Sequence, residues 1–234
     1  MKTFKQLFKH ISVIAFDLDD TLYDRSAFEQ GAYQTLSRHL AKKYQIKEEI
    51  LLKEFLSIRE EKHSNYPHLF STALARVGID DPNSLEMCLQ AYRSYQPITL
   101  MLYPGVLQVL SRLGKEYVLA LITNGREKTQ RHKVQALGLE SSFQSIVYAD
   151  ALGEKRQFRK PHSKPYEVLL QEFQIDPSQM LYVGDNPFVD FLGALSLGVH
   201  CVRVLTGEYR QVPLDSSVQE KVYTTESIEA FFHE

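Results

Sequence analysis

Near the start of the chain stands Val13-Ile14-Ala15-Phe16-Asp17-Leu18-Asp19-Asp20-Thr21-Leu22, a short apolar run that passes directly into acids. An apolar run of this length predicts a buried strand of a parallel sheet. Side chains two residues apart on a strand point to the same side, so Asp17 and Asp19 should converge at its carboxyl end, where open α/β sheets bind ligands. Two carboxylates held close together repel each other unless a proton or a cation intervenes, and Mg²⁺ suits a site made only of oxygens.

A strand that merely runs into an Asp-rich turn would explain the same residues without any chemistry. The neighbouring Asp20 is expected to point to the other side of the chain and to take no part in the site. The choice between a turn and a metal site therefore depends on the residues at the ends of the later strands.

The bulk properties of the chain indicate the class of partner. With 234 residues, the chain can form one large domain or a core with one inserted module. Its 27 basic and 29 acidic residues nearly cancel. No polybasic surface for a nucleic acid polymer or an anionic membrane is therefore predicted, and a small phosphorylated metabolite fits better. The oligomeric state is not readable from these properties.

The cysteines and the hydropathy indicate the compartment. Cys88 and Cys201 are far apart and form no C-x-x-C motif, so neither a disulfide framework nor a zinc site is predicted. No window approaches the roughly 18 uninterrupted apolar residues of a membrane span. We therefore expect a cytoplasmic protein.

Short apolar runs and helical patterns alternate over much of the chain. The predicted strands are residues 13–16, 117–122, 145–148, 180–183 and 199–204, and the predicted helices between them are residues 106–113, 127–137, 166–173 and 190–197. This alternation predicts an α/β fold with a doubly wound, mainly parallel sheet.

Residues 24–99 interrupt the alternation. They contain helical patterns at 27–44, 50–63, 70–77 and 84–95, with breakers at Pro67, Gly78 and Pro82 and no convincing strand. About 75 residues are too many for one crossover connection, so this stretch is predicted to be an inserted helical module. It leaves the sheet beside the acids, which makes it a candidate lid. The alternative is a helical bundle that is tolerated as an insertion and has no function of its own.

Polar residues suited to a phosphate follow the later strands. Thr123-Asn124-Gly125 offers a hydroxyl and free backbone N–H groups before a helix. A group of cations follows the third strand, and phosphoryl transfer needs one such fixed cation; the group consists of Lys155, Arg156, Arg159, Lys160 and Lys164. The fourth strand ends in Gly184-Asp185-Asn186, with Asp190 at the start of the next predicted helix, where helix capping would also explain it.

These motifs resemble the haloacid dehalogenase (HAD) superfamily, in the group with a helical C1-type cap. Asp17-Leu18-Asp19-Asp20-Thr21 resembles its first motif, D-x-D-x-T, and Thr123 its second. Lys160-Pro161, with Tyr166 six residues after the lysine, is similar to K-P-x-P-x-x-F. Gly184-Asp185 through Asp190 resembles the fourth motif. The resemblance covers nearly the whole chain.

One departure from the third motif leaves an alternative open. Ser163 stands where the family often has proline, and Lys164-Pro165 forms a second Lys-Pro pair. Lys164 therefore remains a weaker candidate for the motif lysine. The resemblance implies a Rossmann-like catalytic core of residues 1–22 and 100–234, with a cap at residues 23–99.

The resemblance also implies catalytic roles. Asp17 is expected to attack phosphorus and form an aspartyl-phosphate. Asp19 is expected to protonate the departing alcohol and then to activate the water that hydrolyses the intermediate. Mg²⁺ is expected on Asp17, on the backbone carbonyl of Asp19 and on Asp185.

The remaining motif residues are expected to hold the phosphate and support the site. The predicted phosphate-binding groups are Thr123, the backbone N–H of Asn124 and Lys160. The groups that bind the phosphate and the metal are expected to be held in place by Asp190, Thr21 and Asn186. Asp190 is expected to fix Lys160 or a metal-bound water.

The first motif favours a phosphatase over a dehalogenase, since a dehalogenase attacks carbon and needs neither a leaving-group acid at Asp19 nor Mg²⁺. A phosphomutase with the same core remains an alternative, as do a phospho-accepting signalling domain and a non-catalytic binding protein. The motifs further resemble the branch that contains N-acylneuraminate-9-phosphatase and house-cleaning 5'-nucleotidases. Substrate selection is expected in the cap, with Tyr23, Arg25, Tyr66 and His68 as candidate contacts.

Overall fold

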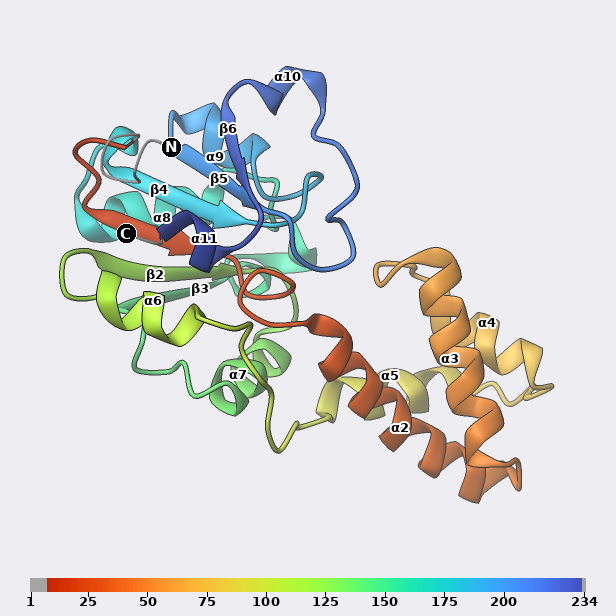
Figure 1. The fold of residues 1–234 in the computed structure, drawn as a ribbon. Helices are drawn as coiled ribbons and strands as arrows, with labels where there is room; N and C mark the ends of the chain where they lie inside the picture. The colour runs from red at the N-terminus through yellow and green to blue at the C-terminus, as the bar shows by residue number, and fades with distance from the viewer. Residues whose placement is uncertain (1–7, 233–234) are drawn as a thin grey trace. The chain divides into compact units, whose positions relative to one another are not determined.

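Parallel strands form the sheet of the protein in a computed structural model that describes residues 8–232. Within these residues the sheet has six strands in the order β3-β2-β1-β4-β5-β6 (Figure 1). The strands are β1 (Val13–Phe16), β2 (Val118–Thr123), β3 (Ser145–Tyr148), β4 (Met180–Gly184), β5 (His200–Val204) and β6 (Val222–Thr225). All five neighbouring pairs are parallel. The predicted α/β fold class is therefore confirmed.

The central strand β1 decides where a ligand site can form. It pairs with β2 on one side and with β4 on the other, so that Phe16 lies opposite both Leu121 and Val183. The strand order reverses direction between β1 and β4, and open α/β sheets bind ligands outside the carboxyl ends of the strands at such a point. The residues that follow β1 and β4 are therefore in the position to form a site.

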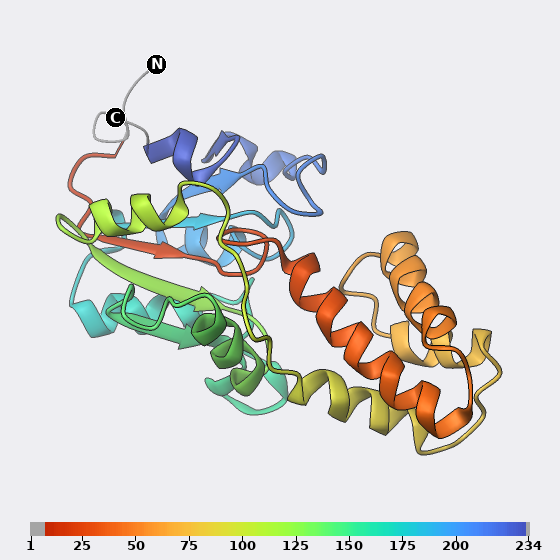
Figure 2. The same ribbon diagram turned by 60° about the horizontal axis from the view of Figure 1, so that its bottom comes forward.

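Helices cover both faces of this sheet. They are α6 (Val106–Leu113), α7 (Glu127–Ala136), α8 (Lys164–Phe173), α9 (Leu192–Leu197), α10 (Ser216–Gln219) and α11 (Ile228–Phe232), with the 3₁₀ turns η1 (Ala149–Ala151), η2 (Glu154–Arg156) and η3 (Pro177–Gln179). Figure 2 shows α6 (yellow-green) and α8 (teal) on opposite sides of the sheet. Every residue of β1 is buried, because alternate side chains of a covered strand pack on one face or the other.

The five predicted strands lie within two residues of strands in the structure, but the sequence did not predict β6, α10 or α11. Strand β6 has only four residues, and only Val222 among them is fully buried. The sequence Val222-Tyr223-Thr224-Thr225 carries no continuous apolar run, which is the signal that predicts the other strands, including the equally short edge strand β3. The predicted helix 190–197 begins later, at Leu192, because the preceding residues form a turn.

A second compact unit consists of Ser26–Thr99, and the first unit consists of the residues up to Arg25 and from Leu100 onward. The helices of the second region are α2 (Arg25–Tyr44), α3 (Glu48–Lys62), α4 (Leu69–Arg76) and α5 (Ser84–Ser94). Tyr33 stacks against Phe55 and Tyr92, with ring centroids 5.6 and 5.9 Å apart. The helical unit thus has a hydrophobic core of its own. No helix among the described residues is long and apolar enough to cross a membrane.

Candidate active site

Asp17 is the first residue after β1, and the sheet itself positions it. Its backbone N–H donates to the carbonyl of Val183 at 2.8 Å, which continues the pairing of β1 with β4 by one residue. The side chain is buried, with 7% of its residue surface exposed. Burial raises the pKa of Asp17 to about 7, although Lys160 acts in the opposite direction.

Lys160 lies directly against Asp17 and is itself buried. Its Nζ donates to Asp17 Oδ1 at 2.5 Å, to the Tyr182 hydroxyl at 2.6 Å and to Asp190 Oδ1 at 2.7 Å. An ammonium group has three hydrogens, so each of them has an acceptor. Burial by itself would lower the pKa of Lys160, but Asp17 and Asp190 outweigh it and hold the pKa above its usual value.

The competing candidate, Lys164, lies elsewhere. It begins α8 and its Nζ stands 3.6 Å from Glu167, in a partly exposed pair. Of the two lysines of the third motif, the structure therefore brings Lys160 to Asp17 and leaves Lys164 on the helix surface.

Asn124 fixes the backbone of Lys160. The Asn124 side-chain amide donates to the Lys160 carbonyl at 3.0 Å, and the Lys160 N–H donates to Asn124 Oδ1 at 2.9 Å. This two-point contact joins the turn after β2 to the segment that carries the lysine. The side chain of Asn124 thus holds Lys160, whereas the predicted phosphate contact uses its backbone N–H.

Asp190 anchors Lys160 from the other side. Its Oδ1 accepts hydrogen bonds from Lys160 and from Tyr182, and its Oδ2 accepts the N–H of Asn186 at 2.8 Å. The residue is not the cap of α9, because that position belongs to Phe191. The helix-capping interpretation is therefore wrong, and both carboxylate oxygens of Asp190 serve the site.

Asp185, which follows β4, supplies a second buried carboxylate near Asp17. The Thr21 hydroxyl lies 3.1 Å from Asp185 Oδ1 and 3.2 Å from Asp17 Oδ2, and so bridges the two acids. Asp185 Oδ2 is buried and has no hydrogen-bond partner among the described residues. Burial, reinforced by the charges of Asp190 and Asp17, raises the pKa of Asp185 well above its usual value.

These acids fit a divalent cation. Asp17, Asp185 and Asp190 each offer a carboxylate oxygen within 4.8 Å of the others. Since hydrogen bonds already occupy both oxygens of Asp190 and both oxygens of Asp17, the orphaned Oδ2 of Asp185 is the oxygen best placed to receive a cation. A buried carboxylate oxygen without a donor is costly unless a cation or a proton satisfies it. Carboxylate oxygens are the ligands that hard cations such as Mg²⁺ prefer.

The side chain of Asp19 is not a member of this acidic cluster. It accepts hydrogen bonds from Lys133, Gln130 and Tyr23, which all belong to the first unit. Burial alone would raise the pKa of Asp19, but the charges of Lys133 and Arg25 outweigh it and lower the pKa to about 2. Only its backbone carbonyl, the group that the resemblance implies, is left as a possible metal ligand.

Gln130 connects the turn after β2 to the Asp19 carboxylate. The Gln130 amide donates both to Asp19 Oδ2 at 3.0 Å and to the Thr123 hydroxyl at 2.5 Å. Asp150 secures the other side of the turn, where it accepts the N–H of Gly125 at 3.1 Å and pairs with Arg159. Thr123 therefore has a fixed orientation at the end of its strand.

Sequence reasoning missed the roles of Tyr182, Lys133 and Asp150. Tyr182 lies inside the apolar run of β4, which by itself predicts a core residue, and Lys133 is one polar residue in a predicted helix. For Lys133 a usable signal exists, since it follows Gln130 by three residues and both occupy one helix face. Asp20 instead accepts the N–H of Arg25 at 3.0 Å, outside the acidic cluster.

The candidate substrate contacts fall into both units. Tyr23 is fully buried and donates to Asp19 Oδ1, so it lies beside the acids that follow β1. Tyr66 and His68 lie in the helical unit, where their rings pack edge to face at 5.7 Å. A substrate contact by these last two residues stays a prediction.

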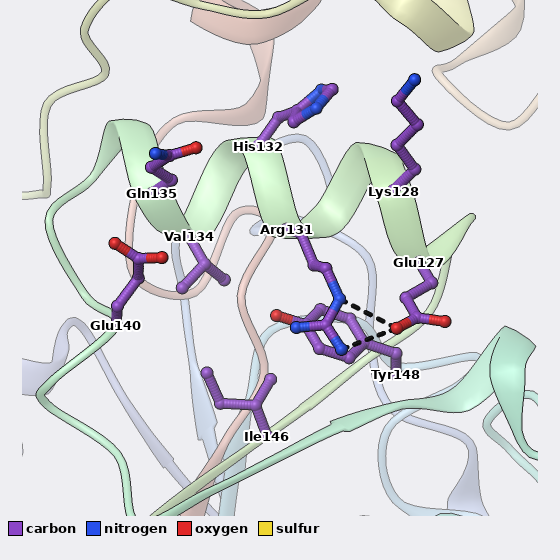
Figure 3. A pocket seen from close by; sticks show the side chains of 9 residues that line it. All are labelled: Glu127, Lys128, Arg131, His132, Val134, Gln135, Glu140, Ile146 and Tyr148. Carbon is purple, nitrogen blue, oxygen red and sulfur yellow. Dashed lines mark hydrogen bonds and ion pairs between the residues drawn. The ribbon is translucent and has the colours of Figure 1, made fainter.

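A pocket of about 610 Å³ opens on the other side of α7 (Figure 3). Arg131 lies there over the ring of Tyr148 and donates to Glu127 at 2.8 Å. None of the predicted site residues lines it. Helix α7 therefore presents Gln130 and Lys133 to the acids and a different set of side chains to this pocket.

Known proteins resemble the chain over most of its length. A family model described as haloacid dehalogenase-like hydrolase matches residues 14–204. A glyceraldehyde 3-phosphate phosphatase of Pyrococcus furiosus is 30% identical over 210 residues, which cover 88% of this chain and 86% of that protein. An N-acylneuraminate-9-phosphatase of Mus musculus is 27% identical, with 88% and 87% covered.

Solved structures share the fold. A HAD-hydrolase from Bacillus subtilis, bound to magnesium, superposes with a TM-score of 0.64 at 20% identity and covers 96% of this chain and 98% of that one. A 2-haloacid dehalogenase from Pseudomonas syringae superposes with a TM-score of 0.62 at 24% identity, with 93% and 94% covered. At these identities the likeness concerns the fold alone.

Proposed function

The chain belongs to the haloacid dehalogenase-like hydrolase family, and on this premise we propose that it is a Mg²⁺-dependent phosphatase acting on a small phosphorylated metabolite. The observation that carries the proposal is the buried contact of Asp17 with Lys160, beside the orphaned carboxylate oxygen of Asp185. A nucleophile, a fixed cation and a metal ligand are the groups that phosphoryl transfer requires.

In the first half-reaction a carboxylate oxygen of Asp17 attacks phosphorus. The bond from phosphorus to the ester oxygen breaks as the new bond to Asp17 forms. The leaving oxygen takes a proton from Asp19 in its protonated form and departs as an alcohol. The product is an aspartyl-phosphate on Asp17.

In the second half-reaction water hydrolyses this intermediate. Its oxygen forms a bond to phosphorus, one of its protons passes to the Asp19 carboxylate, and the bond between phosphorus and Asp17 breaks. Inorganic phosphate leaves, and Asp19 keeps the proton that it donates to the leaving oxygen in the next turnover. Asp19 thus acts as an acid in one half-reaction and as a base in the other.

The phosphate is held by the residues at the strand ends. Thr123, the backbone N–H of Asn124 and Lys160 supply donors to its oxygens. Because the three hydrogens of Lys160 already have acceptors, a phosphate oxygen takes the place of one of them when the substrate binds. Mg²⁺, held by Asp17, Asp185 and the backbone carbonyl of Asp19, would offset the negative charge on the phosphate when bound.

The substrate class follows from the relatives. Glyceraldehyde 3-phosphate phosphatase and N-acylneuraminate-9-phosphatase are both named for small phosphorylated compounds. These names favour a sugar phosphate over the nucleotide that the motif resemblance also implies, and we propose the helical unit Ser26–Thr99 as a cap that selects the substrate. A second hydroxyl of the same substrate could accept the phosphoryl group in place of water, which would make the protein a phosphomutase.

The proposal is tested by a screen of sugar phosphates, nucleotides and acid phosphates with Mg²⁺. We expect release of inorganic phosphate, and we expect Asp17→Asn to lower kcat by at least about 10⁴-fold because it removes the nucleophile. Asp80→Asn, at an exposed aspartate of the helical unit, is the matched control and should leave kcat unchanged.

Three results would contradict the proposal. Full activity of Asp17→Asn would remove the proposed nucleophile. Conversion of a sugar phosphate to its isomer without phosphate release would establish the phosphomutase. A phosphorylated protein that lasts for hours without turning over small esters would point to a signalling domain.

A further inference from the structure

The carboxylate of Asp19 is surrounded by hydrogen-bond donors. Lys133 Nζ stands 2.7 Å from Oδ1 and 2.9 Å from Oδ2. The Tyr23 hydroxyl donates to Oδ1 at 2.5 Å, and the Gln130 amide donates to Oδ2 at 3.0 Å. Ammonium and amide nitrogens cannot accept a hydrogen bond, so both oxygens of Asp19 act as acceptors here.

Helix α7 supplies two of these donors from one buried face. Lys133 has only 4% of its surface exposed, and Gln130, three residues earlier, has 2%. Residues three apart on a helix lie side by side, so both reach the same carboxylate. The opposite side of the helix lines the pocket of Figure 3 and includes the exposed Lys128.

Packing alone does not account for a lysine at this position. Burying an ammonium and a carboxylate carries a large desolvation cost, and apolar side chains of similar volume often replace such pairs without loss of stability. A long apolar residue would therefore fill the same space. The contact of Nζ with both oxygens instead fixes the rotation of the carboxylate, which a single contact would leave free.

We propose that Lys133 is a positioning residue that fixes the orientation of the Asp19 carboxylate for the hydrolysis of the aspartyl-phosphate. This inference rests on the proposed phosphatase function. In that step the water oxygen bonds to phosphorus, one water proton passes to the Asp19 carboxylate, and Asp17 leaves as a carboxylate. Lys133 contributes through Asp19, and Gln130 ties the same carboxylate to Thr123 at the phosphate site.

The two half-reactions can be separated with p-nitrophenyl phosphate and Mg²⁺. Its leaving group departs as a stable phenolate, so formation of the aspartyl-phosphate needs little help from an acid. For this ester kcat/KM reports the steps up to release of nitrophenolate, whereas kcat also contains hydrolysis of the intermediate.

In Lys133→Met we expect slow hydrolysis of the aspartyl-phosphate with nearly normal formation. Both kcat and KM should fall about 10- to 100-fold, within the range of general acid–base contributions, while kcat/KM changes less than about threefold. A burst of nitrophenolate approaching one equivalent per protein should precede the slow turnover. Lys133→Arg should restore part of kcat, and Lys128→Met, the matched control on the same helix, should match the wild type.

Other outcomes would overturn the inference. A fall of kcat/KM in parallel with kcat, without a burst, would show that Lys133 supports the first step or only the fold. A rise in KM with unchanged kcat would show that Lys133 contacts the substrate. If Lys133→Met does not fold, Tyr23→Phe removes one donor to the same carboxylate without leaving a buried charge unpaired. Tyr23→Phe should also lower kcat and KM together and give a burst of nitrophenolate, with smaller decreases than Lys133→Met. If kcat and KM do not fall together in Tyr23→Phe, the positioning role is contradicted.

Failure of the inference is distinct from failure of the proposed function. Wild-type protein that releases neither nitrophenolate nor phosphate with Mg²⁺ would refute the phosphatase itself. An active wild type together with an unchanged Lys133→Met variant would refute only the role of Lys133.

Discussion

At the scale of single residues, Lys160 is the side chain on which the site is centred. Its ammonium group joins the acid after β1 to an acid beyond β4 and to a tyrosine within β4. Removing one acceptor from a buried charge is more costly than removing a neutral hydrogen bond. The role of Tyr182 can therefore be measured by deleting its hydroxyl.

Tyr182→Phe should lower the free energy of unfolding by about 1–3 kcal/mol, since a hydrogen bond to a buried charge is lost. The hydroxyl both accepts from Lys160 and donates to Asp190 Oδ1 at 2.8 Å, so both partners lose a contact. Urea denaturation measures the change. Tyr223→Phe in β6 is the control and should change the stability by less than about 0.5 kcal/mol. Equal effects of the two variants would show that the hydroxyl of Tyr182 has no special role.

At the scale of elements, the end of β4 depends on Gly184. A Cβ atom at this position would lie 2.5 Å from Asp190 Oδ2, which is closer than such atoms approach each other. The carboxylate occupies that space because it accepts the N–H of Asn186 and holds Lys160. The strand end and the turn after it therefore form one packed unit.

Gly184→Ala should push Asp190 away from Lys160. We expect a loss of about 1–3 kcal/mol of stability from overpacking, and a fall in kcat because the lysine loses an anchor. Thermal melts and phosphate release measure the two effects. In Gly114→Ala, at the end of α6, the nearest contact would be 3.3 Å, so this control should retain full kcat. An unchanged kcat in Gly184→Ala would show that catalysis does not depend on the present position of the Asp190 carboxylate.

At the scale of the whole molecule, the buried acids make stability depend on pH and on the cation. Burial raises the pKa of Asp17 to about 7 and raises that of Asp185 as well. In the unfolded chain such carboxyls titrate near pH 4. Between these values the folded protein binds more protons than the unfolded chain, so its stability falls as the pH rises.

The Tm of EDTA-treated protein should therefore be several degrees lower at pH 8 than at pH 5, since about 1 kcal/mol corresponds to about 2–4 °C for a chain of this size. Mg²⁺ should raise the Tm most at pH 8, because it binds the ionised acids of the folded state. Calorimetric scans at both pH values measure this. In Asp185→Asn the Tm should depend less on pH and less on Mg²⁺ than in the wild type. A Tm of the EDTA-treated wild type that does not change with pH would contradict the proposed effect of the buried acids.

Local signals in the sequence predicted the parallel sheet, which is confirmed, and they indicated the helical insertion and the polar residues at the strand ends. These signals are apolar runs of strand length, helical periodicity, and acids or glycines directly after a strand. Asp17, Thr123 and Asp185 could be proposed for this reason, since each follows its strand within a residue or lies at its end. The short edge strand β6 carried no such signal.

The contacts that surrounding side chains make with those residues are set by tertiary packing alone. The local motif already favoured Lys160 over Lys164. That Tyr182 turns from β4 toward Lys160, and that Lys133 reaches Asp19 across 114 positions of sequence, follows only from the packed structure. Each outcome depends on how a helix or strand is rotated against the sheet when the core packs. That rotation is set by contacts between distant segments, so helical periodicity can place Lys133 beside Gln130 but cannot say which carboxylate they reach.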